Sequence, residues 1–249
     1  MDEERVVIKK ESLASLAGAV RIATGGTAKL KASDLVGEIG KIVSVRDLVE
    51  RKITSYTNYS LTMVYAYTFY QCANLKYVNL PKATVIEDRA FSYSGVTDEV
   101  VNTLLKKCIQ LGNGAFAGCG SLTSIKTPIT SSYCFQGCTN LTKLDFSETK
   151  QYSFSFYAVE GCNKLKTLLC GSKQIDNYSR IAIDGGKVWL SSNCTSADAN
   201  TFSKCKNLKV YVEATTAPAG YKAGWDVTAD GTATVAYGVS KEEFEALAG

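Results

Sequence analysis

The side chains with the greatest chemical potential in this sequence are nine cysteines, and the chain has no histidine. Without histidine, neither a Ser-His-Asp triad nor a Cys-His nucleophile pair can form, and zinc loses its usual nitrogen ligand. Cys134 and Cys138 lie close together, but no second pair has the spacing of a zinc site. We therefore expect no catalytic residue, no metal and no cofactor, and we predict that the protein is not an enzyme.

Five of the cysteines share one sequence context, Cys-x-x-Leu, usually with an aromatic residue three positions earlier. The clearest copy is AFAGCGSLTSI at residues 115–125, and a degenerate copy has Ser94 in place of the cysteine. The cysteines of this slot are Cys72, Cys119, Cys138, Cys162 and Cys205. Successive copies from 72 to 162 follow one another at 19 to 25 residues, which is the period of leucine-rich repeats. Cys170 and Cys194 lie outside the slot, and we expect them as surface thiols.

A repeat of this length predicts short strands that stack into a solenoid, because one repeat alone cannot bury its apolar side. Neighbouring strands lie about 4.8 Å apart, so the Phe, Cys and Leu of each copy should contact their equivalents in the next. Cysteine then serves as a small buried apolar residue. An unmarked copy should lie between Cys162 and Cys205, with its strand at residues 185–190, GGKVWL.

The repeated phrase resembles the BspA-type leucine-rich repeat of bacterial proteins, which reads A-F-x-x-C-x-x-L-x-x-I-x-L-P. The resemblance spans roughly residues 69–212, and the first copy ends with the expected Leu80-Pro81. It implies an α/β repeat fold, a leucine-rich-repeat solenoid with short stacked strands and irregular or helical returns. It also implies a non-catalytic binding scaffold, and one candidate function is a bacterial cell-surface adhesin that binds host matrix or other cells.

The strand side of such a solenoid is its usual binding surface. In the first copy Val78 and Leu80 should point inward, so Tyr77 and Asn79 should face outward, because strand side chains alternate. The same register in later copies gives the candidate binding face, which consists of Tyr77, Asn79, Ser124, Lys126, Lys143, Asp145, Thr167 and Leu169.

One repeat departs from the pattern at residues 97–108, TDEVVNTLLKKC. Its apolar residues recur at helical spacing, and Thr97 is a plausible N-cap, so one coil should carry a helix. Two aromatic clusters, at residues 56–70 and 152–157, leave two readings open. Tyrosine is enriched at binding surfaces, but it also packs at the edges of solenoids, and we favour the structural reading.

Residues 1–55 contain no copy of the repeat. Helical periodicity predicts a helix over residues 12–22 and a shorter one from residue 33. This stretch resembles an N-terminal segment of tail-associated proteins from phages and prophages of Gram-positive bacteria. The matching residues are Ile8, Lys9, Leu13, Ala17, Val20, Arg21, Thr24 and Gly25. The resemblance implies attachment to other virion proteins, and these helices could also mediate oligomerisation.

The chain should leave the repeat after residue 212. Asp230-Gly231 predicts a type I′ hairpin. Ser240 with Glu243 predicts a capping box, and Val239 with Phe244 a hydrophobic staple, at the start of a last helix. We therefore divide the chain into a helical attachment or capping region at 1–55, the solenoid at 56–212 and a C-terminal cap at 213–249.

Net charge is +4, from 28 basic and 24 acidic residues that are interspersed, so we expect no nucleic-acid partner. No apolar run reaches the ~20 residues that span a bilayer, and the charged N-terminus lacks the pattern of a secretory signal. We expect a protein or cell-surface glycan partner and no membrane insertion. The preferred hypothesis is a phage or prophage tail-associated protein on the virion, and the alternative is the adhesin, secreted or at the cell surface.

Overall fold

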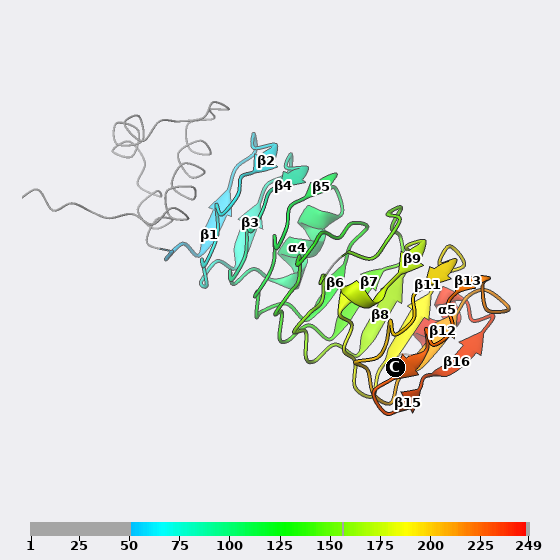
Figure 1. The fold of residues 1–249 in the computed structure, drawn as a ribbon. Helices are drawn as coiled ribbons and strands as arrows, with labels where there is room; N and C mark the ends of the chain where they lie inside the picture. Colours follow the sequence, from blue (N-terminus) through cyan, green and yellow to red (C-terminus); the bar gives the residue numbers. More distant parts are fainter. Residues whose placement is uncertain (1–50, 156, 248–249) are drawn as a thin grey trace, which may run out of the picture.

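The computed structural model describes residues 51–155 and 157–247, and this part of the chain winds into a solenoid of short stacked strands (Figure 1). The coils follow one another from β1 (Ser55–Thr57) to β16 (Thr234–Tyr237). The predicted leucine-rich-repeat fold is therefore confirmed. The helices expected at residues 12–22 and from residue 33 lie outside the described residues.

The main side of the solenoid carries a six-stranded parallel sheet in the order β16, β12, β10, β8, β7, β6. Besides β16, the strands of this sheet are β6 (Ser124–Lys126), β7 (Lys143–Phe146), β8 (Thr167–Cys170), β10 (Lys187–Leu190) and β12 (Lys209–Val212). Strand β10 confirms the prediction of an unmarked repeat between Cys162 and Cys205. A separate parallel pair, β1 with β3 (Tyr77–Asn79), precedes this sheet in the chain.

A second side of the solenoid carries strands of two residues each, arranged in two parallel sheets. The first consists of β2 (Met63–Val64), β4 (Val85–Ile86) and β5 (Gln110–Leu111), and the second of β9 (Gln174–Ile175), β11 (Ser196–Ala197) and β13 (Gly220–Tyr221). The third side consists mainly of tight turns, with one 3-10 helix, η1 (Asn177–Ser179). We call this third side the turn side.

The core is built from columns of identical residues. Phe69 stacks on Phe91 and Phe91 on Phe116, with ring centroids 5.0 and 5.3 Å apart. Cysteines of the repeated slot donate to the phenylalanine carbonyl of the preceding coil: Cys119 Sγ lies 3.0 Å from Phe91 O, and Cys138 Sγ lies 3.2 Å from Phe116 O. A thiol is a weak donor, and here it adds a second hydrogen bond to buried carbonyls that already accept a backbone N–H, as Phe91 O does from Ser94 at 3.0 Å.

All nine cysteines are buried, so the expectation that Cys170 and Cys194 are surface thiols is wrong. Cys170 is the last residue of β8 and shares its inward face with Leu168, because alternate strand residues point to the same side. Its Sγ lies 3.0 Å from Ser172 Oγ. The cysteines outside the slot therefore extend the apolar core.

In one coil, helix α4 (Asp98–Leu105) takes the place of a main-side strand (Figure 1). Its apolar stripe is buried, as the sequence predicts, through Val100, Val101, Leu104 and Leu105. Thr97 occupies the N-cap position, but its side chain makes no capping hydrogen bond. The helix contacts both β3 and β6, so it separates the β1–β3 pair from the six-stranded sheet.

The strand ladder continues beyond residue 212, because β13 pairs with β11 and β16 pairs with β12. The predicted hairpin forms between β14 (Val227–Thr228) and β15 (Gly231–Thr232), with Ala229 and Asp230 as its turn residues. Neither has a positive φ, so the expected type I′ turn at Asp230-Gly231 is wrong. The Asp230 carboxylate instead accepts hydrogen bonds from Thr228 Oγ1 at 2.8 Å and from the backbone N–H of Asn207 at 2.9 Å, which hold this turn.

Helix α5 (Lys241–Ala246) ends the described chain and begins with the predicted capping box. Ser240 Oγ accepts from the Glu243 N–H, and Glu243 Oε2 accepts from the Ser240 N–H at 2.8 Å. Hydrogen bonds from the Ser240 N–H and hydroxyl lower the pKa of the Glu243 carboxyl, because they favour its charged form. Val239 and Phe244 pack in one apolar cluster, which confirms the staple.

Candidate binding surfaces

We call the outward side of β1, β3, α4 and the six-stranded sheet the strand face. In β3 the predicted alternation is confirmed: Val78 is buried, Tyr77 is 53% exposed and Asn79 is half-buried. In β6 Ser124 and Lys126 are exposed on either side of buried Ile125. These four side chains therefore line the strand face where the sequence placed them.

Helix α4 replaces the missing strand partner of β6 with two side chains, Asp98 and Asn102. The Asp98 carboxylate accepts from the N–H groups of Thr123 and Ser124 at 2.8 and 3.0 Å. Asn102 accepts from the Lys126 N–H at 2.8 Å and donates to the Ser124 carbonyl at 3.3 Å. Residues four apart lie on one face of a helix, so this pair satisfies backbone groups that would otherwise need a neighbouring strand.

Helix α5 covers the strand face over β8, β10 and β12. Apolar outward side chains lie beneath the helix, where buried Leu169 and Trp189 pack with Phe244 of α5. Tyr211 joins them through an edge contact with Phe244, at a centroid separation of 5.4 Å. The Trp189 indole N–H donates to the Val239 carbonyl at 3.0 Å. Leu169 does point outward, but its expected exposure is wrong because α5 lies over it.

Asp145 is also covered, which corrects its expected exposure to solvent. Lys241, at the start of α5, places Nζ 3.6 Å from the Asp145 carboxylate and 2.7 Å from Ser147 Oγ. Asp145 additionally accepts from the Ser147 N–H at 3.0 Å. A carboxylate that is 6% exposed needs such partners, so this outward position anchors α5.

The other end of α5 is held by Lys187 of β10. Its Nζ donates to the Leu247 carbonyl at 2.7 Å and lies 5.3 Å from the centre of the Phe244 ring. A cation is favourable at the carboxyl end of a helix, where carbonyls have no partner. Burial, with the like charges of Lys143 and Lys209, lowers the pKa of the Lys187 ammonium.

One accessible part of the strand face lies over β3, β6 and β7. We call it the open patch, and it consists of Tyr77, Asn79, Ser124, Lys126 and Lys143. Thr167 of β8 is half-buried at its margin. Lys126 pairs with Glu148 at 2.6 Å, and this hydrogen bond raises the pKa of the lysine. Both side chains are more than half exposed, so the pair contributes little to stability and leaves the patch available for contact.

The turn side holds a column of residues with left-handed backbone that the sequence reading missed. We call it the left-handed column, and its members are Tyr67, Arg89, Gly114, Tyr133, Tyr157, Arg180, Asn200 and Gly224. Several of their N–H groups donate to the next coil, as when the Arg89 N–H meets the Asn113 carbonyl at 2.9 Å and the Gly114 N–H meets the Ser132 carbonyl at 2.8 Å. Three of the eight members are glycine or asparagine, which adopt positive φ most easily, but the tyrosines and arginines at the other positions carry no such signal.

Side chains of the left-handed column stack along the solenoid. Tyr133 and Tyr157 are nearly parallel, with centroids 5.2 Å apart. The Arg180 guanidinium lies 5.1 Å from the centre of the Tyr157 ring, and its Nη2 donates to Tyr157 OH at 3.3 Å. That hydrogen bond raises the pKa of Arg180. This part of the column thus carries stacked flat side chains of tyrosine and arginine.

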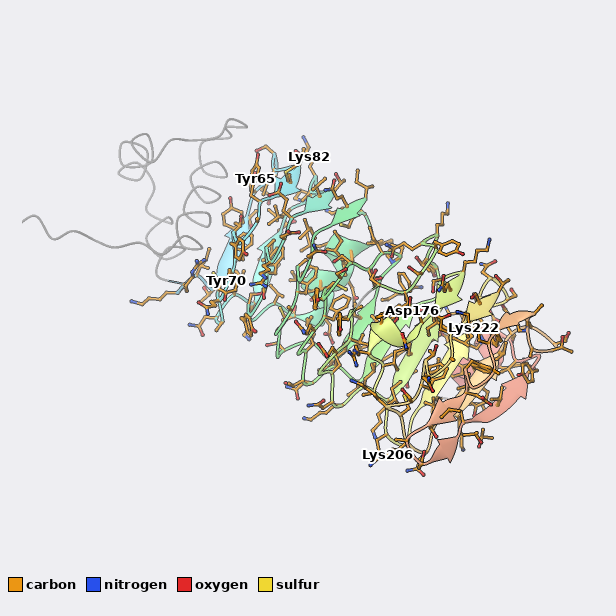
Figure 2. All side chains as sticks on the ribbon, viewed as in Figure 1. Tyr65, Tyr70, Lys82, Asp176, Lys206 and Lys222 are labelled. Atoms are coloured by element: carbon orange, nitrogen blue, oxygen red, sulfur yellow. The ribbon has the colours of Figure 1, made fainter. Side chains whose placement is uncertain are left out.

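The predicted aromatic clusters divide between core and surface. Tyr56 packs on Phe69 at 5.2 Å, and burial raises the pKa of its hydroxyl. Tyr65 and Tyr70 lie in the first coils (Figure 2), and Tyr70 meets Tyr93 edge-on at 6.0 Å. In the second cluster Phe154 is buried. Tyr59 and Tyr152, one from each cluster, are exposed, so neither the structural nor the binding reading covers every member.

The cysteines have the setting of core residues. Burial raises the pKa of the Cys119 thiol to about 11 and that of Cys162 to about 12. The nucleophile of a thiol is its thiolate, which such values suppress near neutral pH. Among residues 51–155 and 157–247, no group of three or more acidic or cysteine side chains could hold a metal ion. None of the helices described is long and apolar enough to span a bilayer.

Comparison with known proteins gives a family match over most of the solenoid. The family is described as a BspA type leucine rich repeat region, and its model matches residues 62–182 and 129–216. No curated protein is similar enough to count as a match.

Two solved structures are similar to the chain at low identity. One is a leucine rich cell surface protein from Faecalibacterium prausnitzii A2-165, with 16% identity, a TM-score of 0.30, and 81% of this chain and 64% of that chain covered. The other is a leucine-rich repeat protein from Bacteroides ovatus ATCC 8483, with 14% identity, a TM-score of 0.24, and 69% and 74% covered. The chain thus spans less than two thirds of the length of the first.

Proposed function

The chain belongs to the BspA-type leucine-rich-repeat family, and from this premise we propose that it is a non-catalytic binding protein of the bacterial cell surface. The observation that carries the proposal is the open patch. Its side chains stand on strands β3, β6 and β7 and point away from the core, whereas α5 covers the same face over Leu169 and Trp189. The exposed tyrosine of this patch is of a residue type that is enriched at protein interfaces.

In this proposal, residues of the open patch contact the partner. Tyr77 supplies the exposed aromatic surface of the patch on β3, and Lys126 and Lys143 supply positive charge on β6 and β7, on the other side of α4. Asp145 and Leu169 take no part, because α5 covers them. The partner is a protein of the host matrix or of another cell.

The proposal keeps the division of the chain into residues 1–55, 56–212 and 213–249. Residues 1–55 would attach the solenoid to its support, and residues 213–249 would cap it, with α5 restricting the accessible part of the strand face. The virion hypothesis draws only on the resemblance of residues 1–55, and the family match begins after them. We therefore favour the cell surface as the location.

An antibody against residues 56–247 distinguishes the two locations. Gold labelling of intact bacteria that produce the protein should decorate the cell envelope. Phage particles induced from the same strain serve as the control and should remain unlabelled. Label on tail tips, with bare cells, would reject the cell-surface proposal in favour of the virion.

Beads coated with the protein test the open patch itself, with adhesion to host cells and to extracellular matrix as the readout. Lys126→Glu reverses a charge in the patch and should reduce adhesion. Lys82→Glu reverses an exposed charge in the connection between β3 and β4, outside the open patch, and is the matched control. Equal adhesion of both variants would show that the open patch is not the contact surface.

A further inference from the structure

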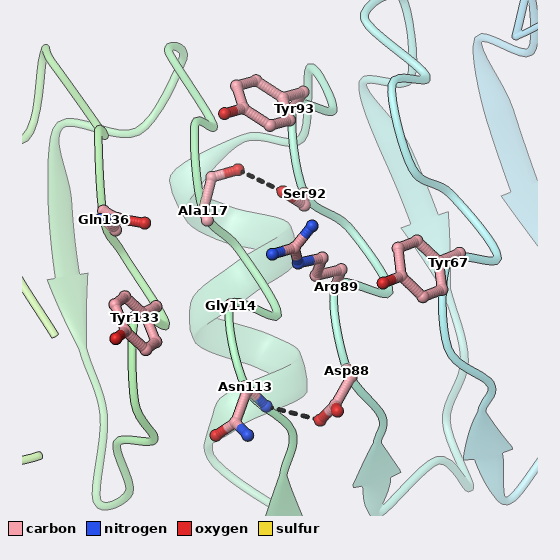
Figure 3. A pocket seen from close by; sticks show the side chains of 10 residues that line it. All are labelled: Tyr67, Asp88, Arg89, Ser92, Tyr93, Asn113, Gly114, Ala117, Tyr133 and Gln136. Carbon is pink, nitrogen blue, oxygen red and sulfur yellow. Dashed lines mark hydrogen bonds between the residues drawn. The ribbon is translucent and has the colours of Figure 1, made fainter. Parts of the chain in front are cut away.

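Between coils that carry tyrosine or arginine, the left-handed column has a position without a side chain. Tyr67 and Arg89 precede this position and Tyr133 and Tyr157 follow it, but the residue between them is Gly114. A cavity of about 470 Å³ opens there, and its lining includes Arg89, Gly114 and Tyr133 (Figure 3). The column therefore contains a slot where one flat layer is missing.

The size of the slot follows from the coil spacing. Coils repeat at about 4.8 Å, so the side chains that flank Gly114 on either side stand roughly 10 Å apart. Two van der Waals contacts of about 4 Å each leave roughly 2 Å for the thickness of a ring between them. A gap of this width takes a single ring, since tyrosines one coil apart in the same column stack at 5.2 Å.

The chemistry of the lining fits the same occupant. Tyr133 presents an aromatic face that is held in place by its stack on Tyr157. Around it lie the Asp88 carboxylate, the Arg89 guanidinium and the Asn113 and Gln136 amides, which offer both donors and acceptors. One positive and one negative group balance each other, so the slot does not select for an anion. Aliphatic C–H faces with hydroxyl groups at the edge match this surface.

The slot is also rigid. The Asn113 N–H donates to Asp88 Oδ1 at 2.7 Å, and Ser92 Oγ donates to the Ala117 carbonyl at 3.0 Å, which joins the two coils on either side (Figure 3). Gln136 is fixed by the Glu160 carboxylate at 2.8 Å. A preformed site loses little entropy when a ligand enters.

We propose that the Gly114 slot binds one pyranose ring of a neutral glycan, with the ring stacked on Tyr133 and its hydroxyls bonded by the surrounding polar side chains. This inference rests on the proposed surface location, and it adds a second site that is separate from the open patch.

Four soluble trisaccharides test the slot: triacetylchitotriose, maltotriose, mannotriose and β-1,3-galactotriose. Saturation-transfer NMR with the full chain should show transfer to at least one of them, with a Kd of about 1 mM or tighter. Gly114→Tyr should abolish that transfer by filling the slot. The variant should fold, because Tyr67, Tyr133 and Tyr157 hold φ of 58°, 61° and 53° at equivalent positions, and Gly114 has 62°.

Tyr133→Ala should weaken binding about five- to ten-fold by removing the stacking face. Tyr59→Ala removes an exposed tyrosine elsewhere and is the matched control. Lack of transfer to all four trisaccharides, or transfer that survives Gly114→Tyr, would overturn the proposal, as would binding of a tyrosine-rich peptide in their place. The antibody labelling reports the surface location independently, so failure of the slot and failure of the location are distinguishable.

Discussion

At the scale of single residues, the repeated cysteine is a core residue with a hydrogen-bonding role. Its thiol donates to a phenylalanine carbonyl one coil away, and burial keeps it protonated. Desolvation is the largest cause of the raised pKa at Cys119, Cys138 and Cys162. The same burial that stabilises the solenoid therefore suppresses thiol reactivity.

This burial predicts a pH dependence of stability. A thiol with a raised pKa in the folded state binds its proton more tightly than in the unfolded chain, where the pKa is about 8.5. The thiols should therefore leave the free energy of unfolding unchanged between pH 7 and about 8, and lower it as the pH rises through 9 and above. Urea unfolding at pH 7 to 10 measures this, and a free energy that increases over that range would contradict the raised pKa values.

At the same scale, the repeat phrase predicted the Phe and Cys columns but gave no warning of the left-handed column. Tyrosine and arginine rarely adopt positive φ, so Tyr133 and Arg89 carry no local signal for it. The conformation is imposed by backbone hydrogen bonds to the next coil, such as Arg89 N–H to Asn113 O. A property that depends on stacking between coils is absent from any one repeat.

At the scale of elements, the two helices divide the strand face in different ways. Helix α4 substitutes for a strand and pairs with β6 through side chains, whereas α5 lies over finished strands. The existence of both helices was predictable from apolar periodicity and the capping box. The docking site of α5 was missed, although outward apolar residues such as Trp189 and Tyr211 in β10 and β12 were its signal.

Asp98→Ala should destabilise the protein by about 1–2 kcal/mol, because it removes a charged acceptor from the N–H groups of Thr123 and Ser124. Glu99→Ala removes the neighbouring acidic residue of the same first turn and is the control for the helix dipole. Urea unfolding of both variants measures the difference. Equal destabilisation would show that the contact with β6 contributes nothing beyond the dipole.

Phe244→Ala should release α5 from the strand face, because Phe244 fills the apolar contact with Leu169 and Trp189. Loss of a buried phenylalanine costs about 3–5 kcal/mol. A helix of six residues is not stable in water without such packing. Trp189 then becomes exposed, and its fluorescence should shift to the red. Leu247→Ala, at a residue that is 56% exposed, should leave the spectrum unchanged, and an unshifted Phe244→Ala spectrum would mean that α5 is held by its polar anchors.

At the scale of the whole molecule, each coil contacts mainly its two neighbours, so stability is distributed along a line. Strand β8 has a partner on both sides, while β16 ends its sheet. Amide exchange of β8 should therefore be slower than that of β16 by at least about ten-fold, a difference of about 1.4 kcal/mol in opening free energy. Mass spectrometry of exchanged peptides measures the ratio, and uniform protection would show that the solenoid opens as one unit.

The left-handed column has a consequence for how relatives of this protein can diverge. Tyr, Arg, Asn and Gly occupy the same backbone geometry in successive coils, so the identity of the side chain there is largely independent of the requirements of folding. A single nucleotide substitution at such a position changes the outer surface while the Phe and Cys columns remain intact. Gene lineages that share this solenoid can therefore acquire new ligand preferences in small steps, without passing through unfolded intermediates.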